Sequence, residues 1–187
     1  MSDTARETLS PERAALVIVD LQEKLLPAMR ESQRVLAAAR TLLHLAKVLE
    51  LPVLLTTQYR KGLGPLLPGV AELAPGVEPV DKVAFGCFGS EAFRERLAAL
   101  QGRDQLVVGG IESHICVTQT VLGALEAGYS VHAVSDAIDS RSEANWRLGL
   151  QRMERAGALV SSVEMASYEL LARADSAAFK QMLPHFK

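Results

Sequence analysis

Short, continuous apolar runs recur along this chain, and each is followed by a stretch in which apolar residues have helical spacing. Four runs are clearest: AALVIVD, PVLLTTQ, DQLVVGG and SVHAVSDA. Strands that are apolar on both faces are typical of the centre of a parallel sheet that helices cover on both sides. Alternating strands and helices therefore predict an α/β protein with an open, Rossmann-like doubly wound sheet in three α/β/α layers.

The remaining segments complete this pattern. VDKVAF contains a further short strand, ALVSS contains a last one, and the Gly- and Pro-rich segment 60–78 is predicted to be a long loop. Ser90 is positioned to cap a helix. Helices are predicted over residues 32–50, 90–100, 113–127, 142–157, 163–172 and 177–183.

Length and composition bound the class of protein. The 187 residues are predicted to form one domain over residues 1–187, with residues 1–12 as a flexible lead-in. A net charge of −2 gives no electrostatic reason to expect a nucleic acid or a membrane as partner, a local patch aside. We expect a cytoplasmic protein with free thiols, because the chain has only two cysteines and no apolar export or membrane-spanning run.

Three chemically capable side chains follow three of the predicted strands. Asp20 closes the first strand, Lys82 ends the third, and Cys116 begins the helix after the fourth. Ligands of such sheets bind beyond the carboxyl ends of the strands, where the strand order reverses. Alone, each residue has an ordinary explanation as a turn former, a solvated charge or a small core residue. Together on one edge, they favour a site.

The position of Cys116 favours a nucleophile. A free thiol with a pKa near ~8.5 is only about 3% thiolate at pH 7. A helix N-terminus and a nearby cation such as Lys82 are expected to lower that pKa to between ~3.5 and ~7.5. Asp20 is positioned to take the thiol proton and later to guide a water. The segment GGIESHIC also supplies backbone N–H groups that can hold an oxyanion, each contributing ~10²–10³ in rate.

Four stretches resemble the isochorismatase-like cysteine hydrolases, the superfamily that includes nicotinamidases and carbamoylsarcosine amidohydrolase. They are LVIVDLQ, DKVAFGCF, LVVGGIESHICVTQT and VSDAIDSRS, and they span nearly the whole chain in family order. TTQYRKGLGP and ALVSSVEMASYELL are most similar to the branch of isochorismatase domain-containing proteins. The resemblance implies a six-stranded, mostly parallel sheet and a homo-oligomer, either a dimer or larger.

The resemblance also implies roles for individual residues. Asp20 would be the general base and acid, Lys82 the electrostatic partner and Cys116 the nucleophile. It implies a cis peptide bond between Ile111 and Glu112, and an oxyanion hole formed by the backbone N–H groups of Glu112 and Cys116. A thioester would form on Cys116, and the substrate would be a small molecule with an amide-type C–N bond.

Two departures from the superfamily narrow the chemistry. Nicotinamidases have a metal site of an acid and paired histidines after the second strand, where this chain has TTQYRKGLG without a histidine. His44, His132 and His185 have no metal-ligand spacing with one another. We therefore expect no metal and no other cofactor, and nicotinamide becomes a less favoured substrate. Isochorismatases proper lack the cysteine, so Cys116 argues against cleavage of a vinyl ether.

Six further residues are candidates for the substrate pocket. The aromatic candidates could wall an apolar pocket for a small planar substrate, with ordinary loop packing as their alternative. The alternative for Gln22 is a polar helix start, and for His114 it is a surface position or a subunit contact. Cys87 is interpreted as a packing residue, because no CxxC motif is present, and Trp146 as core or subunit interface. The candidates are Gln22, Tyr59, Phe85, Phe88, Ser113 and His114.

These observations favour a metal-independent cysteine hydrolase that cleaves a C–N bond of a small molecule. Two alternatives stay open: a redox or detoxifying thiol enzyme, and a non-catalytic small-molecule-binding protein on the same fold. The lack of a matched resolving cysteine counts against the first. The complete set of Asp20, Lys82 and Cys116 counts against the second.

Overall fold

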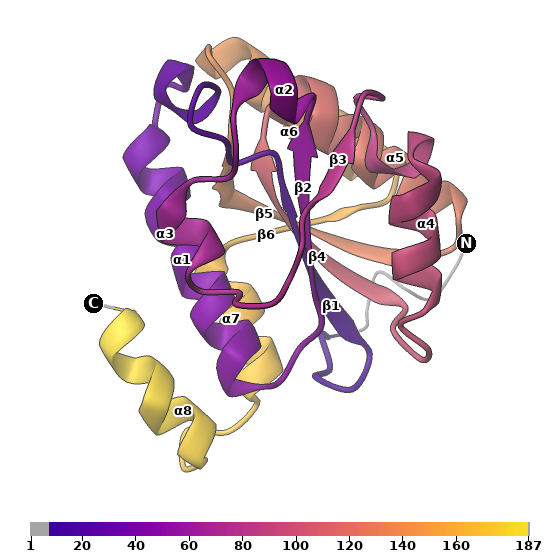
Figure 1. The fold of residues 1–187 in the computed structure, drawn as a ribbon. Coiled ribbons are helices and arrows are strands. Elements are labelled where there is room, and N and C mark those ends of the chain that lie inside the picture. Colours follow the sequence, from indigo (N-terminus) through magenta and orange to yellow (C-terminus); the bar gives the residue numbers. More distant parts are fainter. Residues whose placement is uncertain (1–7, 187) are drawn as a thin grey trace.

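The computed structural model describes residues 8–186 and contains one six-stranded sheet (Figure 1). All of its strand pairs are parallel, and their order is β3-β2-β1-β4-β5-β6. The order reverses between β1 and β4, which lie side by side at the centre. This confirms the predicted doubly wound parallel sheet. The strands are β1 (Ala14–Val19), β2 (Val53–Gln58), β3 (Val80–Lys82), β4 (Gln105–Ile111), β5 (Ser130–Asp139) and β6 (Leu159–Ser161).

Helices cover both faces of the sheet, so the described chain has three layers (Figure 1). The longer ones are α1 (Ser32–Val48), α4 (Glu91–Ala98), α5 (Thr118–Glu126), α6 (Glu143–Arg155), α7 (Val163–Leu171) and α8 (Ala177–Met182). Short helices are α2 (Arg60–Leu63), α3 (Pro68–Ala71), η2 (Leu26–Ala28), η3 (Cys87–Gly89), η5 (Leu183–His185) and the π-helical turn η4 (Ser113–Val117).

The central strand β1 feeds two separate cores, as its apolar sequence predicts. Leu16 and Ile18 belong to the core beneath α1, α3, α7 and α8. Val17 and Val19 belong to the core beneath α4, α5 and α6. Successive side chains of a strand point to opposite faces, so a strand between two helical layers must be apolar at every position.

Local sequence signals place most helix ends correctly. The Ser90 hydroxyl accepts a hydrogen bond from Phe93 N, as the predicted cap requires, and Ser142 caps α6 in the same way. Two predictions need correction. The segment 60–78 is not one loop but contains α2 and α3, and α3 buries Val70 in the core. The helix predicted from residue 113 begins as a π-helical turn and becomes α-helical only at Thr118.

The predicted flexible lead-in over residues 1–12 is wrong for residues 8–12. Residues 1–7 lie outside the described residues, but Leu9 is buried in the core with 3% of its surface exposed. Its N–H donates to the Glu169 carboxylate at 2.9 Å, and Ser10 N–H donates to Gln105 Oε1 at 2.8 Å. Residues 8–12 therefore pack against the domain. Within residues 8–186, no helix is both long and apolar enough to cross a membrane.

Candidate active site

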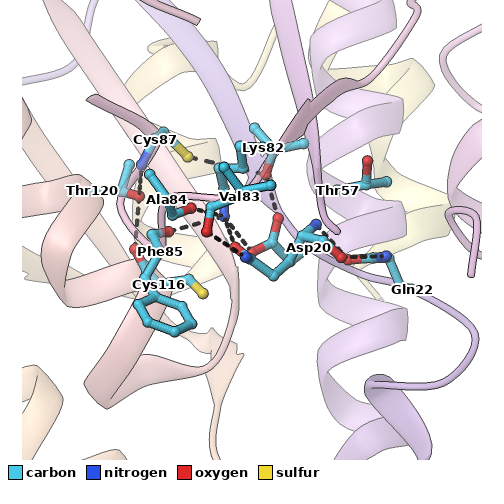
Figure 2. Close-up of polar contacts among 12 residues, drawn as sticks. Asp20, Gln22, Thr57, Lys82, Val83, Ala84, Phe85, Cys87, Cys116 and Thr120 are labelled. Atoms are coloured by element: carbon cyan, nitrogen blue, oxygen red, sulfur yellow. Dashed lines mark hydrogen bonds and ion pairs between the residues drawn. The ribbon is translucent and has the colours of Figure 1, made fainter. Parts of the chain in front are cut away.

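The topology brings Asp20, Lys82 and Cys116 to one edge of the sheet, at the carboxyl ends of β1, β3 and β4 (Figure 2). Asp20 directly follows β1, Lys82 is the last residue of β3, and Cys116 lies in η4. Because β1 and β4 are the strands between which the order reverses, this is the edge where doubly wound sheets bind ligands.

Asp20 is held in a tight turn at the end of β1. Its φ of 55° lies in the left-handed region, which aspartate tolerates better than most residues. Its carboxylate is fully buried and accepts two hydrogen bonds: Oδ2 from Lys82 Nζ at 2.8 Å, and Oδ1 from the Thr56 hydroxyl at 2.7 Å. A buried charge needs such partners to be tolerated.

The ammonium group of Lys82 is also buried, and protein acceptors surround it. Besides Asp20, it donates to Gln58 Oε1 at 2.8 Å and to the carbonyl oxygen of Phe85 at 2.9 Å. A longer contact of 3.4 Å reaches the carbonyl oxygen of Ala84. An ammonium has three hydrogens, so these acceptors use its full donor capacity.

Cys116 is poised as a neutral thiol beside Asp20. Burial, which leaves 7% of the residue exposed, is the main cause that raises its pKa to about 12. The charge of Asp20 and a hydrogen bond to it raise the pKa further, while Lys82 lowers it. The expectation of a lowered thiol pKa is therefore wrong. A buried thiol loses the solvation of its anion, and here the carboxylate and the burial outweigh the cation.

The backbone around Cys116 has unusual geometry. The peptide bond between Ile111 and Glu112 is cis. Gly110 before it has a φ of 125°, and a Cβ there would lie 2.1 Å from the carbonyl oxygen of Val19, so only glycine fits. The carbonyl oxygen of Glu112 accepts from two N–H groups of η4, at 3.1 Å each, and the N–H of Glu112 donates to no other described residue.

Two of the six candidate pocket residues are exposed at this edge, and a third is buried. Tyr59 and Phe85 are 50% and 55% exposed, and the Phe85 ring is drawn beside Cys116 in Figure 2. Gln22 is instead fully buried, and its side chain bonds the backbone of Gln58 through Nε2 (3.1 Å to O) and Oε1 (2.7 Å from N). It therefore ties β2 to the turn after β1, and its structural interpretation is the better one.

The other three candidates make contacts away from Cys116. The partly buried Phe88 ring lies 5.5 Å from the Phe93 ring and packs against the core covered by α4 and α5. The Ser113 hydroxyl donates to the carbonyl oxygen of Trp146 at 3.0 Å, and His114 Nδ1 lies 3.0 Å from the Ser140 hydroxyl. For Phe88, ordinary loop packing is the correct alternative, because its direction is set by the helices behind it.

Two residues of the site were missed at the sequence level. Thr56 and Gln58, on β2, hold Asp20 and Lys82 respectively. The signal was the polar ending of a strand that is otherwise apolar, LLTTQ, since polar groups in a buried strand need partners. Cys87 is fully buried, and burial is the main cause that raises its pKa to about 11.

Metal-ligating side chains do not gather in the described residues: no three or more of His, Cys, Asp and Glu are grouped so that they could hold a metal ion. His44 lies against His185, with ring centroids 4.0 Å apart. The candidate site is therefore built from a carboxylate, an ammonium and a thiol.

Three solved structures have nearly the same fold as this chain. MAR1 ribonuclease from Caenorhabditis elegans matches with a TM-score of 0.89 and 31% identity, over 96% of this chain and 92% of that one. YcaC from Pseudomonas aeruginosa, solved with hexane-2,5-diol and covalent acrylamide, matches with a TM-score of 0.90 and 27% identity, over the same shares. The Escherichia coli YcaC structure, at 28% identity, a TM-score of 0.89 and shares of 95% and 90%, is described as an octameric hydrolase of unknown specificity.

Sequence comparison agrees with the fold. Isochorismatase domain-containing protein 2A of Mus musculus is 35% identical over 175 residues, which cover 92% of this chain and 82% of the mouse protein. The secreted isochorismatase effector Isc1 of Phytophthora sojae is 34% identical over 177 residues, covering 93% and 84%. The model of the Isochorismatase domain matches residues 14–165. The chain therefore belongs to the isochorismatase-domain family of hydrolases.

Proposed function

We propose that this chain is a cysteine hydrolase that cleaves the C–N bond of a small amide without a metal ion. The observation that carries the proposal is the buried Asp20–Lys82 pair, 2.8 Å apart, at the same sheet edge as the buried thiol of Cys116. Weak nucleophiles are activated by a neighbouring base that a third group orients, and here these would be Cys116, Asp20 and Lys82.

The reaction is proposed to run in two stages. Cys116 Sγ attacks the amide carbonyl while its proton passes to Asp20, and the backbone N–H groups of Glu112 and Cys116 hold the oxyanion. The intermediate collapses to a thioester as Asp20 gives its proton to the departing amine. Water then attacks the thioester, Asp20 takes a proton from it, and collapse releases the acid and returns that proton to the sulfur.

The raised pKa of Cys116 determines how the first stage proceeds. With a pKa of about 12, the resting sulfur is a thiol at neutral pH, so its deprotonation must be coupled to attack. A neighbouring carboxylate provides for this, because it accepts the proton as the new bond forms. The same raised pKa disfavours the redox alternative, since oxidant-sensing cysteines react as exposed thiolates.

The surroundings of the thiol favour a small, neutral substrate. Tyr59 and Phe85 place half-exposed rings at this edge, and Lys82 has no hydrogen free for an anionic group. The covalent acrylamide in the P. aeruginosa relative supports a small primary amide as a compound that can reach a nucleophile in this fold. A ribonuclease activity, after the C. elegans neighbour, is less favoured for a chain with a net charge of −2.

Assembly and location are further parts of the proposal. We propose a homo-oligomer, supported by the octameric E. coli relative and by exposed apolar side chains on α6 and α7, where Leu148, Met165 and Tyr168 are each at least 46% exposed. A cytoplasmic location is proposed from the two free cysteines, although the P. sojae relative is secreted.

The test is mass spectrometry of the intact protein after brief exposure to a panel of small amides. The authentic substrate is expected to leave an acyl group on Cys116, and Cys116→Ala is expected to lose both the adduct and turnover. Cys87→Ala is the matched control, because Cys87 is a fully buried thiol that this mechanism does not use. Turnover that survives in Cys116→Ala would overturn the proposal.

A further inference from the structure

Two side chains at the end of strand β2, Thr56 and Gln58, form hydrogen bonds with the buried Asp20–Lys82 ion pair from the same face of the strand. Residues two apart on a strand point to the same face. Thr56 accordingly donates its hydroxyl to Asp20 Oδ1 at 2.7 Å, and Gln58 accepts from Lys82 Nζ at 2.8 Å. Thr57 between them points the other way and bonds Asp81 Oδ1 at 3.0 Å.

The orientation of the Gln58 side chain is fixed at both ends. Its amide Nε2 donates to the carbonyl oxygen of Val83 at 2.9 Å, which leaves Oε1 as the atom that faces Lys82. Its backbone N–H and C=O are both bonded to the side chain of Gln22. Gln58 therefore cannot turn its amide over without losing two hydrogen bonds, and it presents a fixed acceptor to the ammonium.

We propose that Gln58 is a positioning residue of this site: it takes one hydrogen of the Lys82 ammonium, so that Lys82 orients Asp20 and does not donate to the substrate. Asp20 Oδ2, Gln58 Oε1 and Phe85 O lie within 2.9 Å of Lys82 Nζ and occupy its three hydrogens. The catalytic consequence of this inference rests on the function proposed above, but the coordination of Lys82 does not.

A neutral acceptor at position 58 suits this role better than a charged one. The Gln58 amide oxygen binds the ammonium without adding charge, so Asp20 stays the only carboxylate paired with Lys82. A glutamate there would compete with Asp20 for the same cation, and two carboxylates that share one site bind a proton more readily. Gln58 is buried, with 7% of the residue exposed, so solvent would screen this competition little.

The test compares Gln58→Glu and Gln58→Met with the wild type, using acrylamide as the probe. The rate at which Cys116 is modified is followed by mass spectrometry across a range of pH. Gln58→Glu is expected to move the acid limb of the pH profile upward by about one unit, so that the reaction slows about tenfold at pH values below the limb. Thr57→Val is the matched control, since it removes a partly buried hydrogen bond on the opposite face and is expected to leave the limb in place.

A second readout does not depend on reactivity. Nitrogen-15 NMR of the lysine side chains reports how fast the ammonium hydrogens exchange with water, and a buried, fully bonded Lys82 is expected to exchange slowly. Gln58→Met keeps the size of the side chain but removes the acceptor, so exchange at Lys82 is expected to accelerate at least tenfold, while Thr57→Val leaves it unchanged.

These outcomes separate the two proposals. An unmoved acid limb in Gln58→Glu, or unchanged exchange in Gln58→Met, would overturn the role of Gln58 whatever the substrate is. An acid limb that Thr57→Val moves as far as Gln58→Glu would overturn it as well. Loss of the hydrolase proposal would appear separately, as turnover that persists in Cys116→Ala.

Discussion

Replacing Lys82 by methionine is expected to destabilise the protein strongly, because it leaves the Asp20 carboxylate buried without its cation. Both side chains are fully buried, and Lys82 Nζ lies 2.8 Å from Asp20 Oδ2. Methionine is close to the size of the lysine stem, so the expected loss is electrostatic rather than the cost of a cavity. Removing one partner of a buried ion pair typically costs about 3–5 kcal/mol.

Two more acceptors lose their donor in this variant. Gln58 Oε1 and the carbonyl oxygen of Phe85 both receive hydrogen bonds from Lys82 in the wild type. A buried acceptor left without a partner costs about 1–3 kcal/mol, although water can reach the partly exposed segment around Phe85. We therefore expect Lys82→Met to lose about 4 kcal/mol or more, a large part of a typical stability of about 5–15 kcal/mol.

The assay is urea unfolding at pH 7 of the wild type, Lys82→Met, Asp20→Asn and the double variant. The double variant removes both charges together, so it is expected to be more stable than the sum of the single losses predicts, with a coupling of at least ~1 kcal/mol. A loss below about 1 kcal/mol in Lys82→Met, or strict additivity in the double variant, would refute the interpretation of this contact as a buried, interdependent pair.

Three other predictions test the site and its frame. Asp20→Asn removes a charge that raises the pKa of Cys116, so the thiolate absorbance is expected to develop at lower pH while amide turnover is lost. Amide turnover that persists in this variant would contradict the assignment of Asp20 as the base. Burial lowers the pKa of His132 below its unfolded value near ~6.5. The stability that neutral His132 contributes is therefore present above the unfolded pKa and is lost as pH falls from there through the lower folded pKa. His132→Gln is expected to flatten the melting-temperature profile between neutral and mildly acidic pH, and an unaltered profile would contradict this role of His132. In Gly110→Ala the new Cβ would lie 2.1 Å from the carbonyl oxygen of Val19, so this variant is expected not to fold or to lose several-fold more stability than Gly128→Ala. Gly128 is the control because it has a positive φ but open space around it, and about 1 kcal/mol of strain is expected there.

Local features of the sequence were sufficient where the physical cause is local. The apolar run from Ala14 predicts a strand buried on both faces, and β1 feeds both cores as expected. Ser90 predicts a helix start because a cap needs only a hydroxyl near the first free N–H groups. The position of Asp20, Lys82 and Cys116 on one edge followed from topology alone, because parallel strands bring their carboxyl ends together.

Other features depend on neighbours that are distant in sequence. Phe88 was a candidate for the pocket with loop packing as its alternative, and its ring packs against Phe93 and the core beneath α4 and α5. Gln22 looked like a pocket residue, but its partner is the backbone of Gln58 on another strand. The sequence did not predict Gln58 as a site residue, because a glutamine at the end of a strand is most often solvated.

The sequence by itself determined the sheet, its helical layers, the family and the three chemically capable residues, because periodicity and motif order are properties of the chain alone. Only the tertiary structure decided the state of the thiol. The pKa of Cys116 depends on burial, on Asp20 and on Lys82 acting against each other over a few ångströms, and burial with the carboxylate outweighs the cation. The same is true of the hydrogen bonding of Lys82, which depends on the three acceptors that surround its ammonium group.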